Sequence, residues 1–208
     1  MVRKTKDEAE KTRQEIIEAA RAVFHRDGVG RATMEKIAKE AGVTRGAVYW
    51  HFADKAALFF AMREDVFVPL TERTDSFLFS AKFENNPLDA IEASLLEFFR
   101  VLEDCPVVCE LFEIMILRCE FVGEFAGVQQ EVNRPALEFL AKMESFYQRA
   151  AEKGVLLPGL DPLAAARDTW AFTSGLLHQR LLGMLAQVGA EERIPEMVAT
   201  HMALRRSG

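Results

Sequence analysis

Signals for a membrane protein or a sheet-based fold are missing from this chain of 208 residues. It has no apolar run of about 18 residues and no basic segment followed by a short apolar one, so we predict no membrane span and no secretory signal. Alternation of β-branched residues never persists, and no Asn-Gly or Asp-Gly turn joins two such runs. We therefore expect an all-α protein that resides in the cytoplasm and does not associate with membranes.

Cysteine is scarce, and the three cysteines occupy one short stretch: Cys105, Cys109 and Cys119. An odd number at close spacing is a poor disulfide framework, so we expect reduced thiols that pack as small apolar groups. Cys105 and Cys109 lie one helical turn apart and could hold a metal or sense oxidants. No histidine or further cysteine pair completes a zinc site at the usual spacing, so we predict neither a metal nor a cofactor.

Catalytic motifs are missing as well. The four histidines are scattered, no Ser/His/Asp or Cys/His spacing recurs, and no glycine-rich phosphate loop is present. An enzyme of this sequence would need a site assembled from distant side chains. We expect no enzymatic activity, and a helical enzyme and a helical adaptor protein stay as the alternatives.

Charge is unevenly distributed, although the net charge of −6 is acidic. Residues 1–60 hold 12 Lys and Arg against 9 Asp and Glu, whereas residues 61–208 hold 14 against 23. A basic segment on an acidic chain is typical of a protein in which only that segment meets phosphates. We therefore look for a nucleic-acid contact within the first 60 residues.

Apolar periodicity and capping residues predict about nine helices. The expected helices run from Lys6 to Asp27, over Met34–Ala41, from Thr44 to His51, from Asp54 to Phe67, from Pro87, from Pro106, from Glu124 to Glu152, from Pro162 to Leu185 and over Glu191–Leu204. Pro135 lies inside the seventh of these and should kink or break it.

The segment from Thr33 to Phe52 has the pattern of a helix-turn-helix, two short helices around a glycine turn. Thr33 and Thr44 are suited to cap the two helices, and Gly42 can adopt the left-handed conformation that the turn needs. The second helix would offer its first residues to a major groove, where Arg45 can donate a bidentate pair to guanine. The candidates for contacts with phosphate oxygens are Thr33, Thr44, Tyr49, His51 and Lys55.

The same segment resembles a known family. The run from Gly42 to Phe52, followed by Asp54-Lys55 and Leu58-Phe59, is similar to the signature of TetR-type repressors. The opening residues match it as well; they are Arg3-Lys4-Thr5-Lys6, Thr12-Arg13 and Ile16-Ile17. Trp50 and the triplet Cys119-Glu120-Phe121 resemble the AcrR-like branch, which controls multidrug efflux pumps.

The resemblance implies an Ω-shaped homodimer with a DNA-binding head, residues 1–60, and a body for ligand binding and dimerisation, residues 61–208. In such repressors a small hydrophobic inducer in the body separates the two heads and releases a palindromic, double-stranded operator. The resemblance carries over eight DNA contacts: Thr33, Thr44, Arg45, Gly46, Tyr49, Trp50, His51 and Lys55. The alternative is a TetR-type regulator of a metabolic or stress gene with a different ligand.

The body is rich in Phe and Met, which mostly form a packed core but also suit a cavity for an apolar ligand. Three helical faces with a spacing of three or four residues are the candidates for its lining. They are Ile91, Leu95 and Phe98; Phe112 and Ile116; and Trp170, Thr173 and Leu177.

The last two predicted helices present apolar faces that no later helix could cover, so we expect a four-helix bundle between two copies. The expected interface residues are Leu176, Leu177, Leu181, Leu185, Ile194, Met197, Val198 and Met202. The alternative is that one face packs within its own subunit, as we expect for the side from Trp170 to Leu177.

Overall fold

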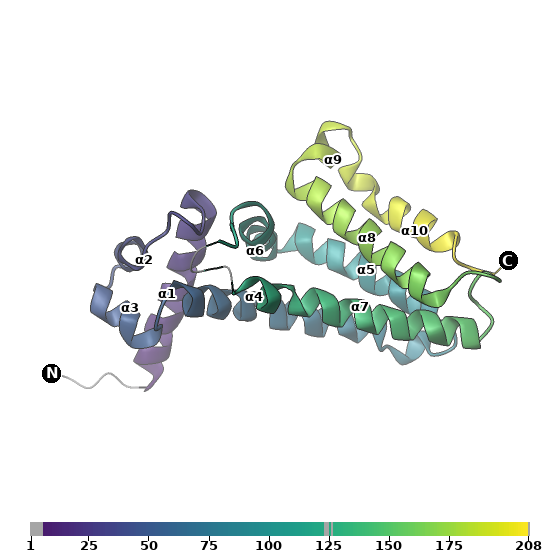
Figure 1. The fold of residues 1–208 in the computed structure, drawn as a ribbon, viewed down its shortest axis with the longest axis horizontal. Helices are drawn as coiled ribbons and strands as arrows, with labels where there is room; N and C mark the ends of the chain where they lie inside the picture. Colours follow the sequence, from purple (N-terminus) through teal and green to yellow (C-terminus); the bar gives the residue numbers. More distant parts are fainter. Residues whose placement is uncertain (1–5, 123–124, 126, 208) are drawn as a thin grey trace. The chain divides into compact units, whose positions relative to one another are not determined.

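The computed structural model describes residues 6–122, 125 and 127–207, and these residues form ten α-helices and no strand (Figure 1). The helices are α1 (Lys6–Asp27), α2 (Met34–Glu40), α3 (Arg45–His51), α4 (Lys55–Leu78), α5 (Pro87–Asp104), α6 (Pro106–Leu117), α7 (Gln129–Glu152), α8 (Pro162–Leu181), α9 (Met184–Gln187) and α10 (Ile194–Ala203). The predicted all-α fold is confirmed. None of the described helices is both long enough and apolar enough to span a bilayer.

The chain divides into two compact units. The first unit comprises Met1–Val68 and Val107–Glu131, and the second comprises Pro69–Pro106 and Val132–Gly208. The sequence predicts a single division at residue 60, which would assign α6 to the body. In the structure α6 belongs to the same compact unit as the helix-turn-helix, and α4 and α7 each contribute residues to both units.

Polar contacts explain why α6 belongs with the head. The Nε atom of Arg21 on α1 lies 3.2 Å from a carboxylate oxygen of Glu110 on α6. After α1, the backbone N–H of Val29 donates to the carbonyl of Arg118, just beyond α6, at 3.0 Å. These partners are far apart in sequence, so the local pattern of each helix does not reveal them.

Each short helix of the head begins at a threonine, as predicted. The hydroxyl oxygen of Thr33 accepts from the backbone N–H of Lys36, and that of Thr44 accepts from the backbone N–H of Ala47, both at 3.2 Å. Each bond satisfies one of the amides that lack a partner inside the helix. Gly42 in the turn has φ +67°, the left-handed conformation expected from the sequence. Within this unit α2 and α3 pack against α1 and against each other (Figure 1).

The sequence predicts that Pro135 kinks or breaks its helix. The structure shows no break, because α7 is continuous through Pro135. A proline ring removes the N–H that would bond to the carbonyl four residues earlier, here that of Glu131. The guanidinium of Arg63 on α4 donates to this carbonyl. A side chain from another helix thus replaces the lost donor. The start of α7 at Gln129 also differs from the predicted start at Glu124, which lies outside the described residues, as do Arg3, Lys4 and Thr5.

Two predicted helix ends are wrong. The fourth helix continues beyond Phe67 to Leu78, although Pro69 lies inside it. The eighth helix ends at Leu181 rather than Leu185, because Gly183 takes a left-handed conformation with φ +67° that ends it. The short helix α9 follows and accounts for ten helices where nine were expected.

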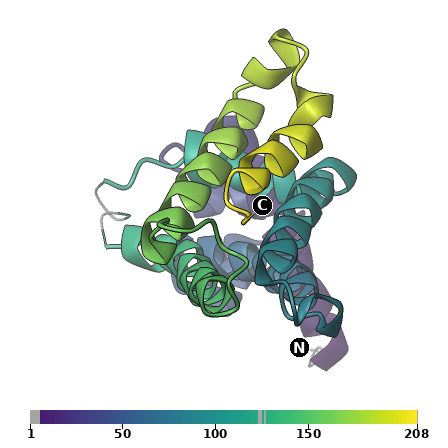
Figure 2. The same ribbon diagram turned by 90° about the vertical axis from the view of Figure 1, so that its right-hand side faces the viewer.

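A chain of buried polar side chains connects α7, α8 and α10 in the second unit, where α8 and α10 run side by side (Figure 2). The hydroxyl oxygens of Tyr147 and Thr169 lie 2.7 Å apart, and that of Thr169 lies 3.0 Å from Nε2 of His201. The His201 ring also stacks on Phe172, with 3.9 Å between ring centroids. Burial, followed by the nearby positive charge of Arg205, lowers the pKa of His201 from 6.5 to about 4. The imidazole is therefore neutral at neutral pH.

Most of the side chains expected at an interface between copies are instead buried within the chain. The buried ones are Leu176, Leu177, Leu185, Ile194, Val198 and Met202. Helix α5 packs against α10, and the Tyr147 hydroxyl contacts the sulfur of Met202 at 3.6 Å. No later helix covers these faces, as expected, but the earlier helices α5 and α7 contact α10, so its apolar face packs within its own subunit.

Candidate DNA-binding site

Helix α3 buries Val48 and leaves its largest side chains in solvent. The side chain of Trp50 is 73% exposed and that of Tyr49 is 44% exposed. The guanidinium carbon of Arg45 lies 5.3 Å from the centroid of the Tyr49 ring, a cation–π distance. Aromatic rings with polar tips have little reason to face solvent unless a partner covers them. This surface of α3 is therefore the candidate binding site of the head.

The end of α3 is anchored by Phe52. Its side chain is 4% exposed, and the guanidinium of Arg13 on α1 lies 5.5 Å from its ring centroid. His51 contacts the neighbouring Trp50 edge to face, with 4.5 Å between centroids. The buried residue thus fixes the helix end, while Trp50 and the partly exposed His51 extend from it.

Gly46 is exposed on α3, close to Thr44, the N-cap of that helix. A Cβ atom placed there would meet only the hydroxyl of Thr44, at 3.9 Å, which is ordinary contact. Its φ is not left-handed, in contrast to that of Gly42. The fold itself therefore does not require glycine at residue 46. Seven of the eight predicted contacts are exposed or partly exposed: Thr33, Thr44, Arg45, Gly46, Tyr49, Trp50 and His51.

Lys55 is the eighth predicted contact, and its side chain is only 8% exposed. Its Nζ atom donates to the carbonyls of Val29 at 2.9 Å and Ala32 at 3.2 Å. The ammonium group is therefore hydrogen-bonded to backbone carbonyls of the head. The sequence does not indicate these bonds.

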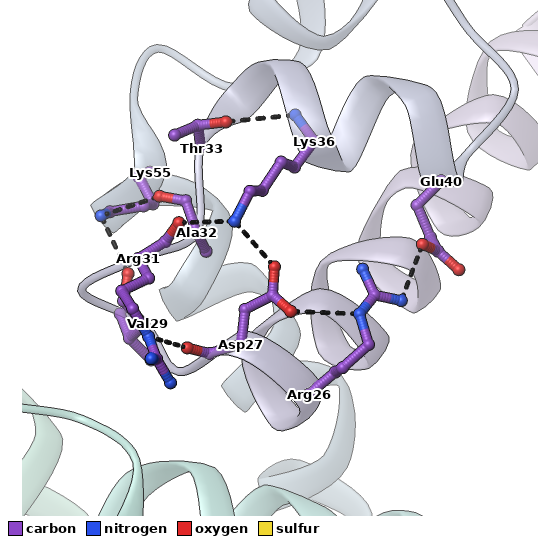
Figure 3. Close-up of polar contacts among 9 residues, drawn as sticks. All are labelled: Arg26, Asp27, Val29, Arg31, Ala32, Thr33, Lys36, Glu40 and Lys55. Carbon is purple, nitrogen blue, oxygen red and sulfur yellow. Dashed lines mark hydrogen bonds and ion pairs between the residues drawn. The ribbon is translucent and has the colours of Figure 1, made fainter.

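Figure 3 shows an ionic network beside the helix-turn-helix that we did not predict from the sequence. Lys36 Nζ lies 2.9 Å from a carboxylate oxygen of Asp27, and Arg26 bonds both Asp27 at 3.1 Å and Glu40 at 3.0 Å. The hydrogen bonds from Lys36 and Arg26 lower the pKa of Asp27. These acidic partners reduce the positive charge that the basic residues of the head could offer to phosphates.

The predicted ligand faces fall in both units of the chain. Ile91 and Leu95 on α5 are fully buried, and Leu177 on α8 is 8% exposed. Thr173 is also buried, and its hydroxyl donates to the carbonyl of Thr169 in its own helix. Phe98 and Trp170 are partly exposed. Lining of a ligand cavity by these residues stays a prediction.

The two candidates on α6 belong to the first unit. Phe112 is buried and packs against Phe67, with ring centroids 5.3 Å apart, whereas Ile116 is 39% exposed.

A buried carboxylate on α5, that of Glu97, was not predicted. It is 3% exposed and lies 2.7 Å from a guanidinium nitrogen of Arg100.

The three cysteines are free thiols of intermediate exposure. Burial is the main cause that raises the pKa of the Cys119 thiol to about 11. Since the thiolate is the reactive form, Cys119 is a poor nucleophile at neutral pH.

Comparison with known proteins identifies the family. Residues 16–62 match the model of the bacterial regulatory proteins of the tetR family. The HTH-type transcriptional regulator AcrR of Shigella flexneri is 39% identical over 189 residues, which cover 87% of this chain and 83% of that protein. The chain belongs to the TetR family. The resemblance inferred from the sequence is thereby confirmed, and TetR-family membership makes the chain a helix-turn-helix transcriptional regulator.

Solved structures of efflux-pump repressors share the architecture over almost the whole chain. NalD, the secondary repressor of the MexAB-OprM multidrug efflux pump in Pseudomonas aeruginosa, superposes with a TM-score of 0.83 at 31% identity and covers 97% of this chain and 98% of its own. SmeT of Stenotrophomonas maltophilia in complex with triclosan has a TM-score of 0.77 at 31% identity, over 95% of this chain and 92% of its own.

Proposed function

We propose that this TetR-family protein is a repressor that binds a palindromic, double-stranded operator through α3. The exposed cluster of Arg45, Tyr49 and Trp50 on a helix that buries Val48 is the observation that supports this proposal most directly. Arg45 is the first residue of α3, where side chains of a recognition helix meet base edges. The aromatic residues and the threonine hydroxyls contact sugar and phosphate, which position the helix in the groove.

We infer further that the regulated genes encode a multidrug efflux pump and that a small hydrophobic molecule is the inducer. NalD and SmeT support this inference, because both are described as repressors of such pumps and SmeT has been solved with triclosan. The protein would act in the cytoplasm, without catalytic activity, on DNA of its own cell.

Selection of duplexes from a random pool by the wild-type protein tests operator binding. On the enriched duplex, Arg45→Ala removes a bidentate contact worth about 1–3 kcal/mol, so affinity should fall roughly 5- to 150-fold and base preference should relax. Arg134→Ala is the control, because Arg134 is an exposed arginine of α7 in the second unit and lies neither on α3 nor on the helices proposed below for the association of two copies. Equal affinity of Arg45→Ala and wild type in a gel-shift titration would contradict the recognition role of α3.

We propose that two copies associate through the exposed sides of α8 and α10. An open groove of about 370 Å³ on these helices is lined in part by Phe172, Met197 and Leu204. Leu204 is 69% exposed, unlike the buried residues that the sequence favoured for this interface. Two copies would form a four-helix bundle, and their twofold symmetry would match two operator half-sites.

Charged substitutions in the groove test this interface. Met197→Asp combined with Leu204→Asp should give a monomer in sedimentation and weaken operator binding, because each half-site then binds independently. Leu137→Asp is the control, since Leu137 is 57% exposed on α7. A dimer that persists in the double variant would place the interface elsewhere.

Calorimetry with triclosan tests the inducer. Binding should be measurable, and saturating operator duplex should weaken it by the factor by which triclosan weakens operator binding, about 5- to 150-fold for a typical coupling. Trp170→Ala should weaken triclosan and leave operator binding without ligand unchanged. Triclosan binding that is indifferent to operator would refute the inducer role.

A further inference from the structure

The ammonium group of Lys55 is buried inside the head, where α4 begins directly after the recognition helix (Figure 3). It donates to the carbonyls of Val29 and Ala32 at 2.9 and 3.2 Å, and lies 5.3 Å from the centroid of the Phe125 ring. A buried cation is costly unless polar groups compensate it, and two carbonyl dipoles with an aromatic face do so here. Lys55 is thus held by contacts on several sides.

The two carbonyls belong to the loop between α1 and α2, which leads directly into the Thr33 cap. Lys55 lies 26 and 23 residues beyond its two partners, on the far side of the helix-turn-helix. Its hydrogen bonds therefore join the chain that enters α2 to the chain that leaves α3.

Further contacts hold the same loop, among them a backbone bond of Val29 and a side-chain bond of Lys36. The N–H of Val29 donates to the carbonyl of Arg118, so both backbone polar groups of Val29 are bonded. Lys36 Nζ donates to the carbonyl of Arg31 at 3.1 Å, from a side chain that is 49% exposed (Figure 3). Lysine side chains thus donate to three carbonyls of this loop, and of the two lysines Lys55 is the buried one.

We propose that Lys55 is a positioning residue for operator binding and does not contact phosphate. Its ammonium fixes the Val29–Ala32 loop on the start of α4, and through Thr33 it sets the place of α2 beneath the recognition helix. A phosphate contact would require Lys55 to leave two carbonyls that would then lose a buried donor. The inference rests on the proposed DNA-binding function, and it assigns Lys55 a role different from that of Arg45 or Thr44.

Amine acylation with acetic anhydride, read by mass spectrometry, tests the burial in wild-type protein. Lys55 should resist acylation in the free protein under conditions that label the exposed Lys39, and should stay equally resistant on the enriched duplex. A phosphate-binding lysine would be labelled in the free protein and protected by DNA. Labelling of Lys55 in the free protein would therefore overturn the inference, whether or not the protein binds DNA.

The salt dependence of Lys55→Met separates positioning from phosphate contact. Loss of a phosphate contact would lower the magnitude of the log–log salt slope by about 0.9. We expect operator affinity to fall by about tenfold or more while the slope stays that of wild type, because a charge-assisted bond that holds the loop is lost. Lys36→Met is the matched control, since water can replace its half-exposed ammonium, and its affinity loss should be smaller.

The outcomes distinguish this inference from the proposed function. A slope reduced by about 0.9 in Lys55→Met would overturn the positioning role. If wild-type protein enriches no duplex, the proposed function fails, and with it any role in operator binding. Thermal unfolding of Lys55→Met shows whether the variant folds; if it does not, the wild-type acylation experiment, with and without DNA, still decides between the two roles.

Discussion

The helix-turn-helix head and the helical body use their polar side chains differently. In the head, Lys55 and Thr33 bond mainly to backbone groups of loops and helix ends, and the tips of the recognition-helix residues stay in solvent. In the body, Tyr147, Thr169 and His201 bond to one another in the interior. In the head, buried Lys55 thus fixes backbone and the polar side chains that bond to one another lie at the surface, whereas in the body such a side-chain network lies in the interior and fixes how the helices pack.

Exposed large side chains differ in the same way. The head exposes the aromatic Trp50, which suits contact with a nucleic-acid backbone, whereas the aliphatic residues Leu182 and Leu204 are exposed where α8 and α10 end. Homodimer interfaces are more apolar than the rest of a protein surface, and an aliphatic side chain has no group that bonds to a phosphate. The chemistry of exposed residues therefore separates the surface proposed for DNA from the surface proposed for a second subunit.

The largest effect on the free energy of unfolding is expected when a buried residue of the head is replaced, and almost none when an exposed one is replaced. Ile37 on α2 is fully buried, so Ile37→Ala should lower the free energy of unfolding by about 2–5 kcal/mol. Trp50→Ala should change it by less than about 0.5 kcal/mol and instead weaken operator binding. Chemical denaturation and gel shifts measure both quantities. A strongly destabilised Trp50→Ala would show that Trp50 serves the fold.

The pH dependence of stability tests the buried network of the body. The pKa of His201 falls from 6.5 to about 4 on folding, so the unfolded chain binds a proton in this range that the folded chain does not. The contribution of His201 to the free energy of unfolding should be fully present above about pH 6.5. It should be lost as the pH falls toward 4, which lowers the free energy of unfolding by at most about 3 kcal/mol. His201→Gln should flatten this decline. Urea titrations at a series of pH values measure it, and an unchanged slope in the variant would exclude His201 as its source.

Two glycines of the head separate a requirement of the fold from a requirement of the partner. Gly42→Ala places a side chain at φ +67°, so it should cost about 1–2 kcal/mol of unfolding free energy. Gly46→Ala lies in α3 without a clash and should leave stability equal or slightly higher, while a Cβ facing DNA should weaken operator binding. Thermal melts and gel shifts distinguish the two. Full operator affinity of Gly46→Ala would show that DNA does not approach this position closely.

The smallest effect is expected from one substitution made in both regions. Tyr147→Phe removes a buried hydroxyl that contacts Thr169 and Met202, and should lower stability by about 1 kcal/mol. Tyr49→Phe removes an exposed hydroxyl and should leave stability unchanged. Parallel denaturation curves measure the difference. Equal stability of both variants would mean that the polar network contributes nothing to the packing of the body.

Local features of the helix-turn-helix were predictable because they depend on neighbouring residues. A threonine cap bonds three residues ahead, and Gly42 supplies its own left-handed turn, so Thr33, Thr44 and Gly42 could be assigned from the sequence. The exposure of Trp50 also followed locally, because Val48 already provides the buried side chain of α3. The family resemblance rested on the same short segment.

Contacts between residues distant in sequence were decided by the tertiary structure alone. The sequence determined a chain of amphipathic helices with a basic helix-turn-helix at its start. It did not determine that Lys55 is buried by the loop before α2, that Arg63 bonds the carbonyl freed by Pro135, or that α5 covers α10. The sequence shows that a residue is lysine but does not show whether its ammonium group binds water, phosphate or a carbonyl. Only the packing of helices brings the carbonyl within hydrogen-bonding distance and thereby selects the role.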